Sequence, residues 1–76
     1  SLVPQEMREL FFTIFHDLFS SRRKTMRNNL LNGTLAKSFT RAAILETIEK
    51  SGLGSMTRGE VFTIDQLVHL TQAFMN

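Results

Sequence analysis

The sequence predicts an all-α fold, a small bundle of three to five helices that pack at steep angles without a sheet. Two observations favour helices: apolar residues recur at spacings of three and four in several stretches, and no stretch alternates apolar and polar residues over the length of a strand. A third observation limits the number of domains. The chain has 76 residues, 42% of them hydrophobic, and no cysteine. A chain of this length forms a single domain with one hydrophobic core, over residues 1–76. Packing must stabilise that core, because there are no cysteines for disulfides or for zinc binding.

The first predicted helix runs from Pro4 to Phe19. Pro4 suits the first turn, where its missing N–H has no intrahelical acceptor, and Glu6 is favoured there by the helix dipole. His16 and Asp17 are assigned to the polar side. Because adjacent residues do not face each other on a helix, we expect both to face solvent and not to form an acid–base pair. The apolar face consists of Met7, Leu10, Phe11, Ile14, Phe15, Leu18 and Phe19.

Ser20-Ser21 interrupts this pattern before a shorter helix, which is predicted from Arg22 to Leu31 and ends at Asn32-Gly33. If the first helix continued unbroken, Arg23 would fall on the apolar stripe, where a charged group is disfavoured. We therefore expect the helix axis to turn at the two serines. We also expect Arg23 to lay its aliphatic stem on the core and to direct its guanidinium to water or to an acid.

The next segment, Asn32 to Thr40, has low propensity for regular structure and is predicted to be a loop. A third helix is predicted from Arg41 to Lys50. Thr40 is a suitable cap at its start, and Gly52 is a suitable residue to end it.

A structured loop is predicted from Ser51 to Phe62, followed by a last helix that Thr63 opens. Gln66, three residues later, completes a capping box with Thr63. The predicted inner face of this helix consists of Ile64, Leu67, Val68, Leu70, Thr71, Phe74 and Met75.

No set of side chains in this chain predicts catalysis. His16 and His69 have no ligand partner three or four residues away, so no metal site is expected. Gly52-Leu53-Gly54 follows a predicted helix, whereas a dinucleotide-binding loop follows a strand, so we interpret it as a helix stop and expect no cofactor here. The chain also lacks an apolar run long enough to span a membrane and a signal-peptide pattern. On these features the compartment is reducing or unspecified, and the cytoplasm is the location we expect.

Basic residues are concentrated in one part of the chain. Between Leu18 and Leu45 there are six bases and no acid, whereas the remainder has three bases and seven acids. The densest part is Arg22 to Asn29, with four cations among Thr and Asn side chains. Positive charge with directional donors suits a phosphate backbone. The alternative, on charge alone, is a solvated basic turn that pairs with the acidic remainder.

The segment Phe15–Leu30 resembles the segment that opens the C-terminal domain of the small-subunit ribosomal RNA adenine dimethyltransferases, the KsgA-type family. A second motif, Arg58-Gly59-Glu60 followed by Val61-Phe62 and a Thr that opens the last helix, extends the resemblance over nearly the whole chain. Two departures are Ser20-Ser21, where a Gln is expected, and Gly59, where Ala is commoner. The matching residues of the first motif are Phe19, Arg22, Arg23, Lys24, Thr25, Met26, Arg27, Asn28 and Leu30.

The resemblance implies that this chain is the C-terminal domain of a larger enzyme. Family members bind S-adenosylmethionine in an N-terminal domain, whose motifs are absent from this sequence, and dimethylate two adjacent adenines near the 3′ end of small-subunit rRNA. The implied partners are that rRNA or the pre-30S particle, and the enzyme's own N-terminal domain. Because Arg23 falls on the apolar stripe, it could instead be structural and pair with Glu60. The implied RNA-contacting residues are Arg22, Arg23, Lys24, Arg27 and Asn28, with Lys37 and Arg41 at the periphery.

Two other functions remain open from the sequence. A small helical domain with a basic turn could bind DNA through a reading helix, but the last helix has His69 as its only candidate cation and also carries Asp65. The chain could instead be a helical module that docks a partner protein domain. The phenylalanines of the first helix are expected to belong to the core, and an exposed apolar patch would favour the docking module.

Overall fold

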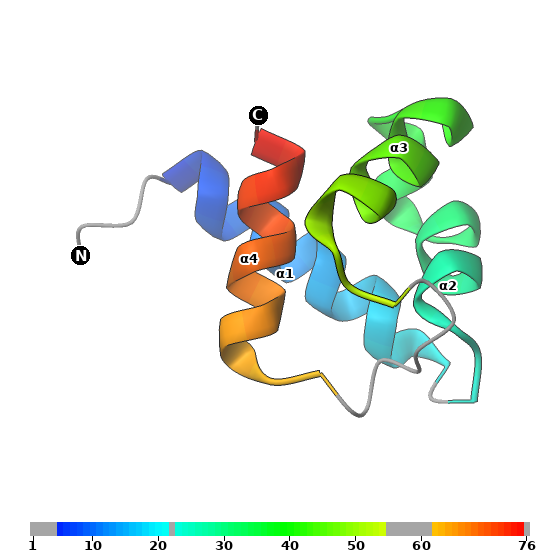
Figure 1. The fold of residues 1–76 in the computed structure, drawn as a ribbon, viewed down its shortest axis with the longest axis horizontal. Helices are drawn as coiled ribbons and strands as arrows, with labels where there is room; N and C mark the ends of the chain where they lie inside the picture. Colours follow the sequence, from blue (N-terminus) through cyan, green and yellow to red (C-terminus); the bar gives the residue numbers. More distant parts are fainter. Residues whose placement is uncertain (1–4, 22, 55–61, 76) are drawn as a thin grey trace.

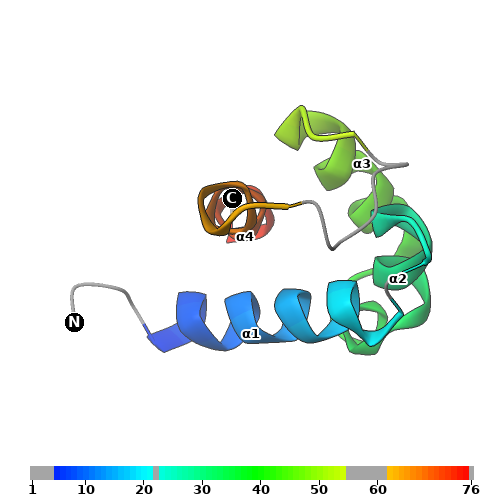
Figure 2. The ribbon, with the colours of Figure 1, turned by 90° about the horizontal axis from the view of Figure 1, so that it is seen from below.

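The computed structural model of the protein describes residues 5–21, 23–54 and 62–75. These residues form four α-helices and one short 3₁₀ helix, η1, and contain no β-strand, which confirms the predicted all-α class. Helix α4 packs across α1 and beside α3, while α2 and α3 lie near one end of α1 (Figure 1). In Figure 2, α1 lies along the page and α4 is seen nearly end-on, so these two helices cross at the steep angle expected.

Helix α1 spans Gln5–Ser20 and confirms the first predicted helix. Its predicted first residue, Pro4, lies outside the described residues. The helix ends at the serine pair, as predicted. The Ser20 hydroxyl donates to the Asp17 carbonyl at 2.7 Å, and such a bond gives the last turn an alternative to continuing the helix.

Helix α2 spans Met26–Asn32 and begins four residues after its predicted start. The reason is Thr25, whose backbone is extended and whose hydroxyl accepts a hydrogen bond from the Asn28 amide at 3.4 Å. A threonine with this geometry is an N-cap, so the helix can only begin after it. Arg23 consequently lies in the preceding turn and is exposed. The predicted break before α2 is confirmed, and the predicted contact of the Arg23 stem with the core stays a prediction.

The short helix η1 spans Thr34–Lys37, inside the segment predicted to be a loop. The prediction is wrong here because local propensity is weak and a tertiary contact decides the conformation. The carboxylate that makes this contact belongs to Asp17, on α1.

Helices α3 and α4 begin where the sequence predicts, and α3 ends one residue later than predicted. Helix α3 spans Arg41–Ser51, and the Thr40 hydroxyl accepts from the Ala43 amide at 3.1 Å. Gly52 ends this helix with a left-handed backbone, φ 76°, which glycine adopts without a Cβ penalty.

Helix α4 spans Ile64–Met75 and is preceded by the predicted capping box. The Thr63 amide donates to the Gln66 side chain at 2.9 Å, and the Gln66 amide donates to the Thr63 hydroxyl at 3.2 Å. Most of the loop expected before this helix, residues 55–61, lies outside the described residues. No described helix has the length and apolar character needed to cross a bilayer.

The core is mainly aliphatic, not aromatic. Of the seven phenylalanines only Phe74 is buried, while Phe12 is 65% and Phe15 39% exposed, so the expectation of a phenylalanine core along α1 is wrong for these two. The face of α1 that points inward carries smaller residues. Ile64 and Met75, assigned to the inner face of α4, are also exposed because they occupy its two ends. The buried hydrophobic residues are Ile14, Leu18, Met26, Leu30, Leu35, Ile44, Ile48, Leu67, Leu70 and Phe74.

Candidate nucleic-acid interface

The predicted cationic residues are exposed wherever the structure describes them. Arg23 and Lys24 lie in the turn between α1 and α2, and Arg27 lies on the first turn of α2. We refer to these three residues as the basic turn. Arg22, predicted to belong to the same group, lies outside the described residues. The neighbouring Asn28 is also exposed, as predicted for a neutral donor.

The two peripheral candidates occupy different elements. Lys37 is the last residue of η1, and Arg41 is the first residue of α3. Both are exposed. The predicted site residues that the structure describes are therefore surface residues on the turn, α2, η1 and the start of α3, and none of them is held inside a cavity.

The buried side chain of Asn29 bonds the backbone of the basic turn to the end of α1. This side chain is only 4% exposed, and its amide nitrogen donates to the carbonyls of Leu18 at 3.1 Å, Ser21 at 3.0 Å and Lys24 at 3.4 Å. A single amide therefore ties the end of α1 to the turn. The Lys24 carbonyl accepts one of these bonds, while the Lys24 side chain is exposed to solvent.

Sequence reasoning did not separate Asn29 from the other polar residues of this segment. The signal was its spacing: Asn29 lies three residues after Met26 and directly before Leu30, on the face of α2 that is buried. Thr25 is likewise used by the fold, since its hydroxyl accepts from the Asn28 amide. Of the neutral residues first grouped as phosphate donors, Asn28 is the one whose side chain is left exposed.

Asp17 has a structural role that the sequence analysis missed. It is 1% exposed, not solvent-facing as expected. One carboxylate oxygen accepts from the Thr34 amide at 2.9 Å and from the Thr34 hydroxyl at 2.8 Å, and the other accepts from the Leu35 amide at 2.8 Å. The carboxylate thus satisfies the first amides of η1, which have no partner within that helix. The adjacent His16 is exposed, as predicted.

Gly33 allows this contact between α1 and η1. A Cβ at this position would lie 2.4 Å from the Asp17 side-chain carboxyl carbon, so any larger residue would displace the carboxylate from the η1 amides. The signal for Asp17 in the sequence was its position three residues after Ile14, on the face that α1 buries. Asp17 and Gly33 together fix η1, and with it the position of Lys37 at its end.

Charges near the basic turn are not neutralised by the described carboxylates. Among residues 5–21, 23–54 and 62–75, the ion pair within 4 Å is the one between Lys50 and Glu46, at 2.9 Å on the exposed surface of α3. The predicted pairing of Arg23 with Glu60 stays a prediction, since Glu60 lies outside the described residues.

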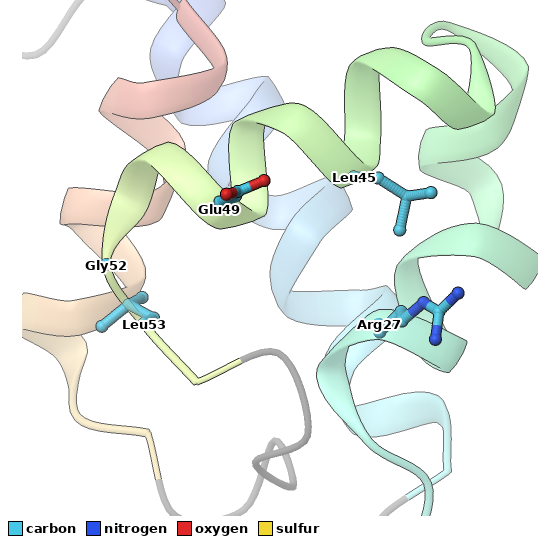
Figure 3. A pocket seen from close by; sticks show the side chains of 5 residues that line it. All are labelled: Arg27, Leu45, Glu49, Gly52 and Leu53. Atoms are coloured by element: carbon cyan, nitrogen blue, oxygen red, sulfur yellow. The ribbon is translucent and has the colours of Figure 1, made fainter.

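Arg27 also borders a groove between α2 and α3. Figure 3 shows Leu45 and Glu49 on α3 along one wall, with Arg27 on α2 across from them. The groove has a volume of about 480 Å³ and continues past Leu53, after the end of α3. It carries one cation and one anion on a partly apolar surface. No group of three metal-ligating side chains occurs in the described part of the chain.

Comparison with known proteins places these features in one family. No protein-family model matches the chain. Three curated relatives are the ribosomal RNA small subunit methyltransferase A of Shouchella clausii, 35% identical over 63 residues, that of Alkaliphilus metalliredigens, 34% over 70 residues, and that of Desulfotalea psychrophila, 33% over 78 residues. The matches cover 83%, 92% and 95% of this chain. The chain is a homologue of the C-terminal region of ribosomal RNA small subunit methyltransferase A.

The chain spans about a quarter of the length of these relatives: 21%, 24% and 26% of the three methyltransferase A sequences lie in the matched stretch. The predicted resemblance to this enzyme family is therefore confirmed for one region of it. The name of the relatives gives small-subunit ribosomal RNA as their substrate. In this methyltransferase A homologue, the basic turn places three exposed cations close together in the described chain.

Proposed function

We propose that this chain is the RNA-binding, substrate-positioning C-terminal domain of a small-subunit rRNA adenine dimethyltransferase. In this proposal the rest of such an enzyme binds S-adenosylmethionine and dimethylates two adjacent adenines near the 3′ end of the rRNA during ribosome biogenesis, in the cytoplasm. The substrate would be the rRNA itself or the pre-30S particle. The observation that supports the proposal is the exposed basic turn, in a homologue of methyltransferase A.

The basic turn supports backbone binding in a specific way. Arg23 and Arg27 offer planar guanidinium groups, which can donate two hydrogen bonds to one phosphate, and Lys24 offers a point charge between them. Asn29 bonds the backbone carbonyls of Ser21 and Lys24, which reduces the conformational entropy that these residues would lose on binding RNA. Phosphate contacts of this kind set the position and orientation of a nucleic acid without reading its sequence.

This role is complementary to base methylation. An enzyme that modifies a base must take it out of its stack, so the surrounding backbone has to be held while the base occupies the catalytic pocket. In the proposal the pocket lies in the part of the enzyme that this chain does not include, and the basic turn holds the backbone. Lys37 and Arg41, on η1 and α3, would extend the positive surface.

A DNA-reading role is less well supported by the structure. The reading helix of such a module would be α4, whose only candidate cation is His69. Its ring nitrogen Nε2 donates to the Ser51 carbonyl at 2.7 Å, so this histidine ties α4 to the end of α3. Asp65 in the first turn of α4 would repel phosphate.

The proposal is tested by a salt-series titration of the 76-residue chain. The ligands are the rRNA 3′ hairpin that carries two adjacent adenines, and duplex DNA. If four to six phosphates are neutralised, affinity for the hairpin should fall by about two to three decades between roughly 50 and 200 mM salt. Binding to the hairpin should also be stronger than binding to the duplex.

Charge-reversal variants separate the basic turn from general electrostatics. In the first, Arg22, Arg23, Lys24 and Arg27 are all changed to Glu, and hairpin binding should be lost. A pair of double variants then matches the charge change: Arg23→Glu with Lys24→Glu should lose most of the affinity, whereas Arg8→Glu with Lys50→Glu, on α1 and α3 outside the proposed site, should keep most of it. A flat salt response, or equal losses in the two double variants, contradicts RNA binding by the basic turn.

A further inference from the structure

A second distinctive surface lies on the N-terminal half of α1. Here α1 and α4 border a groove of about 220 Å³, lined by Met7, Phe11 and Phe12 from α1 and by Val68 from α4. The one charged residue among the described lining residues is Arg8. The lining of this groove is apolar. The basic turn, in contrast, follows the C-terminal end of α1, where the chain leads into α2 (Figure 2).

Phe12, at the rim of this groove, is not part of the hydrophobic core. Phe12 is 65% exposed, and its ring meets the edge of Phe11 at a centroid distance of 5.7 Å. Ile64, at the start of α4, is 61% exposed. The core is filled without either side chain, by Ile14 and Leu18 from α1 and by aliphatic residues of the other helices. Contiguous exposed apolar surface marks interaction sites, and Phe12 is continuous with the apolar lining that Met7, Phe11 and Val68 give this groove.

The charges around the groove favour a protein over a nucleic acid. Glu6 and Glu9 are exposed on the same half of α1, and they would repel a phosphate backbone. Phe12 also lies eight residues before the end of α1, about 12 Å along the helix axis, so the groove is separate from the basic turn. A partner that fits would present apolar side chains to the groove and a carboxylate to Arg8.

We infer that this groove is the surface on which the rest of a methyltransferase A chain docks. About three quarters of each relative lies outside the matched stretch, so a protein partner of the required size exists in the family. Docking would bury Phe12 and Val68 and would hold the basic turn at a fixed position relative to the catalytic part. The inference rests on the proposed function, because it takes this chain to work as one part of that enzyme.

Thiol labelling tests the inference, since the chain has no cysteine of its own. Phe12→Cys places a thiol at the rim of the groove, and Ala42→Cys places a control thiol on the exposed surface of α3. Each variant is labelled with a small maleimide in two contexts: the 76-residue chain alone, and a chimera in which this chain replaces the matched 63 residues of the Shouchella clausii protein. Labelling is followed by mass spectrometry of the modified peptide.

The expected result is labelling at position 12 that is at least about tenfold slower in the chimera, with position 42 unchanged within about twofold. Equal rates at position 12 in both contexts overturn the inference. So does slowing in the isolated chain as its concentration rises, which indicates a second copy, or slowing on addition of the rRNA hairpin, which indicates RNA.

Two additions keep the result interpretable. If the chimera shows no cooperative thermal transition, the Phe12→Cys chain is instead mixed with the Shouchella clausii protein truncated before the matched stretch, and unchanged labelling at saturating concentration counts against docking. The salt titration is repeated with the Phe12→Cys chain. Loss of protection with RNA binding intact refutes the docking surface alone, whereas protection without RNA binding refutes the RNA-binding role alone.

Discussion

Asn28 and Asn29 are adjacent in the sequence and have different roles in the molecule. The Asn28 side chain is exposed beside the basic turn, whereas the Asn29 side chain is buried and donates to three backbone carbonyls. The difference comes from helical geometry, because successive residues on α2 point about 100° apart and only one of them can face α1. At the scale of the residue, the basic turn depends on a side chain that does not itself face solvent.

We therefore predict opposite outcomes for the two asparagines. Asn29→Ala should lower the free energy of unfolding by about 2–3 kcal/mol, because it leaves buried carbonyls without their donor. Asn28→Ala, the matched control, should change it by less than about 0.5 kcal/mol, as for other exposed positions. Urea unfolding followed by circular dichroism measures both. Similar losses for the two variants would show that the hydrogen bonds of Asn29 do not hold the turn.

At the scale of the element, η1 is an example of a helix that a neighbouring helix stabilises. Its four residues are too few to hold their own conformation, and its first amides are bonded by Asp17 from α1. Gly33 keeps the two elements close enough for this contact. By contrast, α3 and α4 carry their own start signals in Thr40 and Thr63, which cap them locally.

Asp17→Asn should accordingly destabilise the domain by about 2–3 kcal/mol although it is nearly isosteric. An amide group has one acceptor oxygen, so its NH₂ would face either the Thr34 or the Leu35 amide, and a buried donor would lose its acceptor. Thermal and urea unfolding of this variant are compared with Glu49→Gln, an exposed carboxylate on α3 that should be near neutral. If the two variants unfold alike, the carboxylate of Asp17 does not stabilise η1.

At the scale of the whole molecule, the residues that form the core are separate from the residues proposed to contact RNA or protein. The core is built from Leu, Ile and Met with a single phenylalanine, while Phe12 and the basic turn remain on the surface at different parts of α1 and its exit. In a chain of 76 residues the core is small, so each buried side chain carries a large share of the stability.

Two alanine substitutions, one in the core and one on the surface, measure how much a buried side chain contributes to the free energy of unfolding. Leu70→Ala should cost about 2–5 kcal/mol, because Leu70 is fully buried and its removal leaves a cavity among α1, α3 and α4. Phe12→Ala removes a larger side chain but should cost less than about 1 kcal/mol, since most of its ring is in water. Denaturant unfolding of the two variants decides the matter. A larger loss for Phe12→Ala would mean that this ring belongs to the core after all.

Local sequence patterns are sufficient to predict the helical class, the ends of α3, the start of α4, the break at the serine pair and the exposed cations. They rest on apolar spacing, on caps formed within three residues, and on the cost of burying an unpaired charge. Packing between helices, in contrast, buries Asp17 and Asn29, forms η1 and leaves Phe12 exposed. Each of these depends on contacts between residues distant in the chain, and periodicity along one helix does not specify which of its apolar and polar residues the other helices will cover.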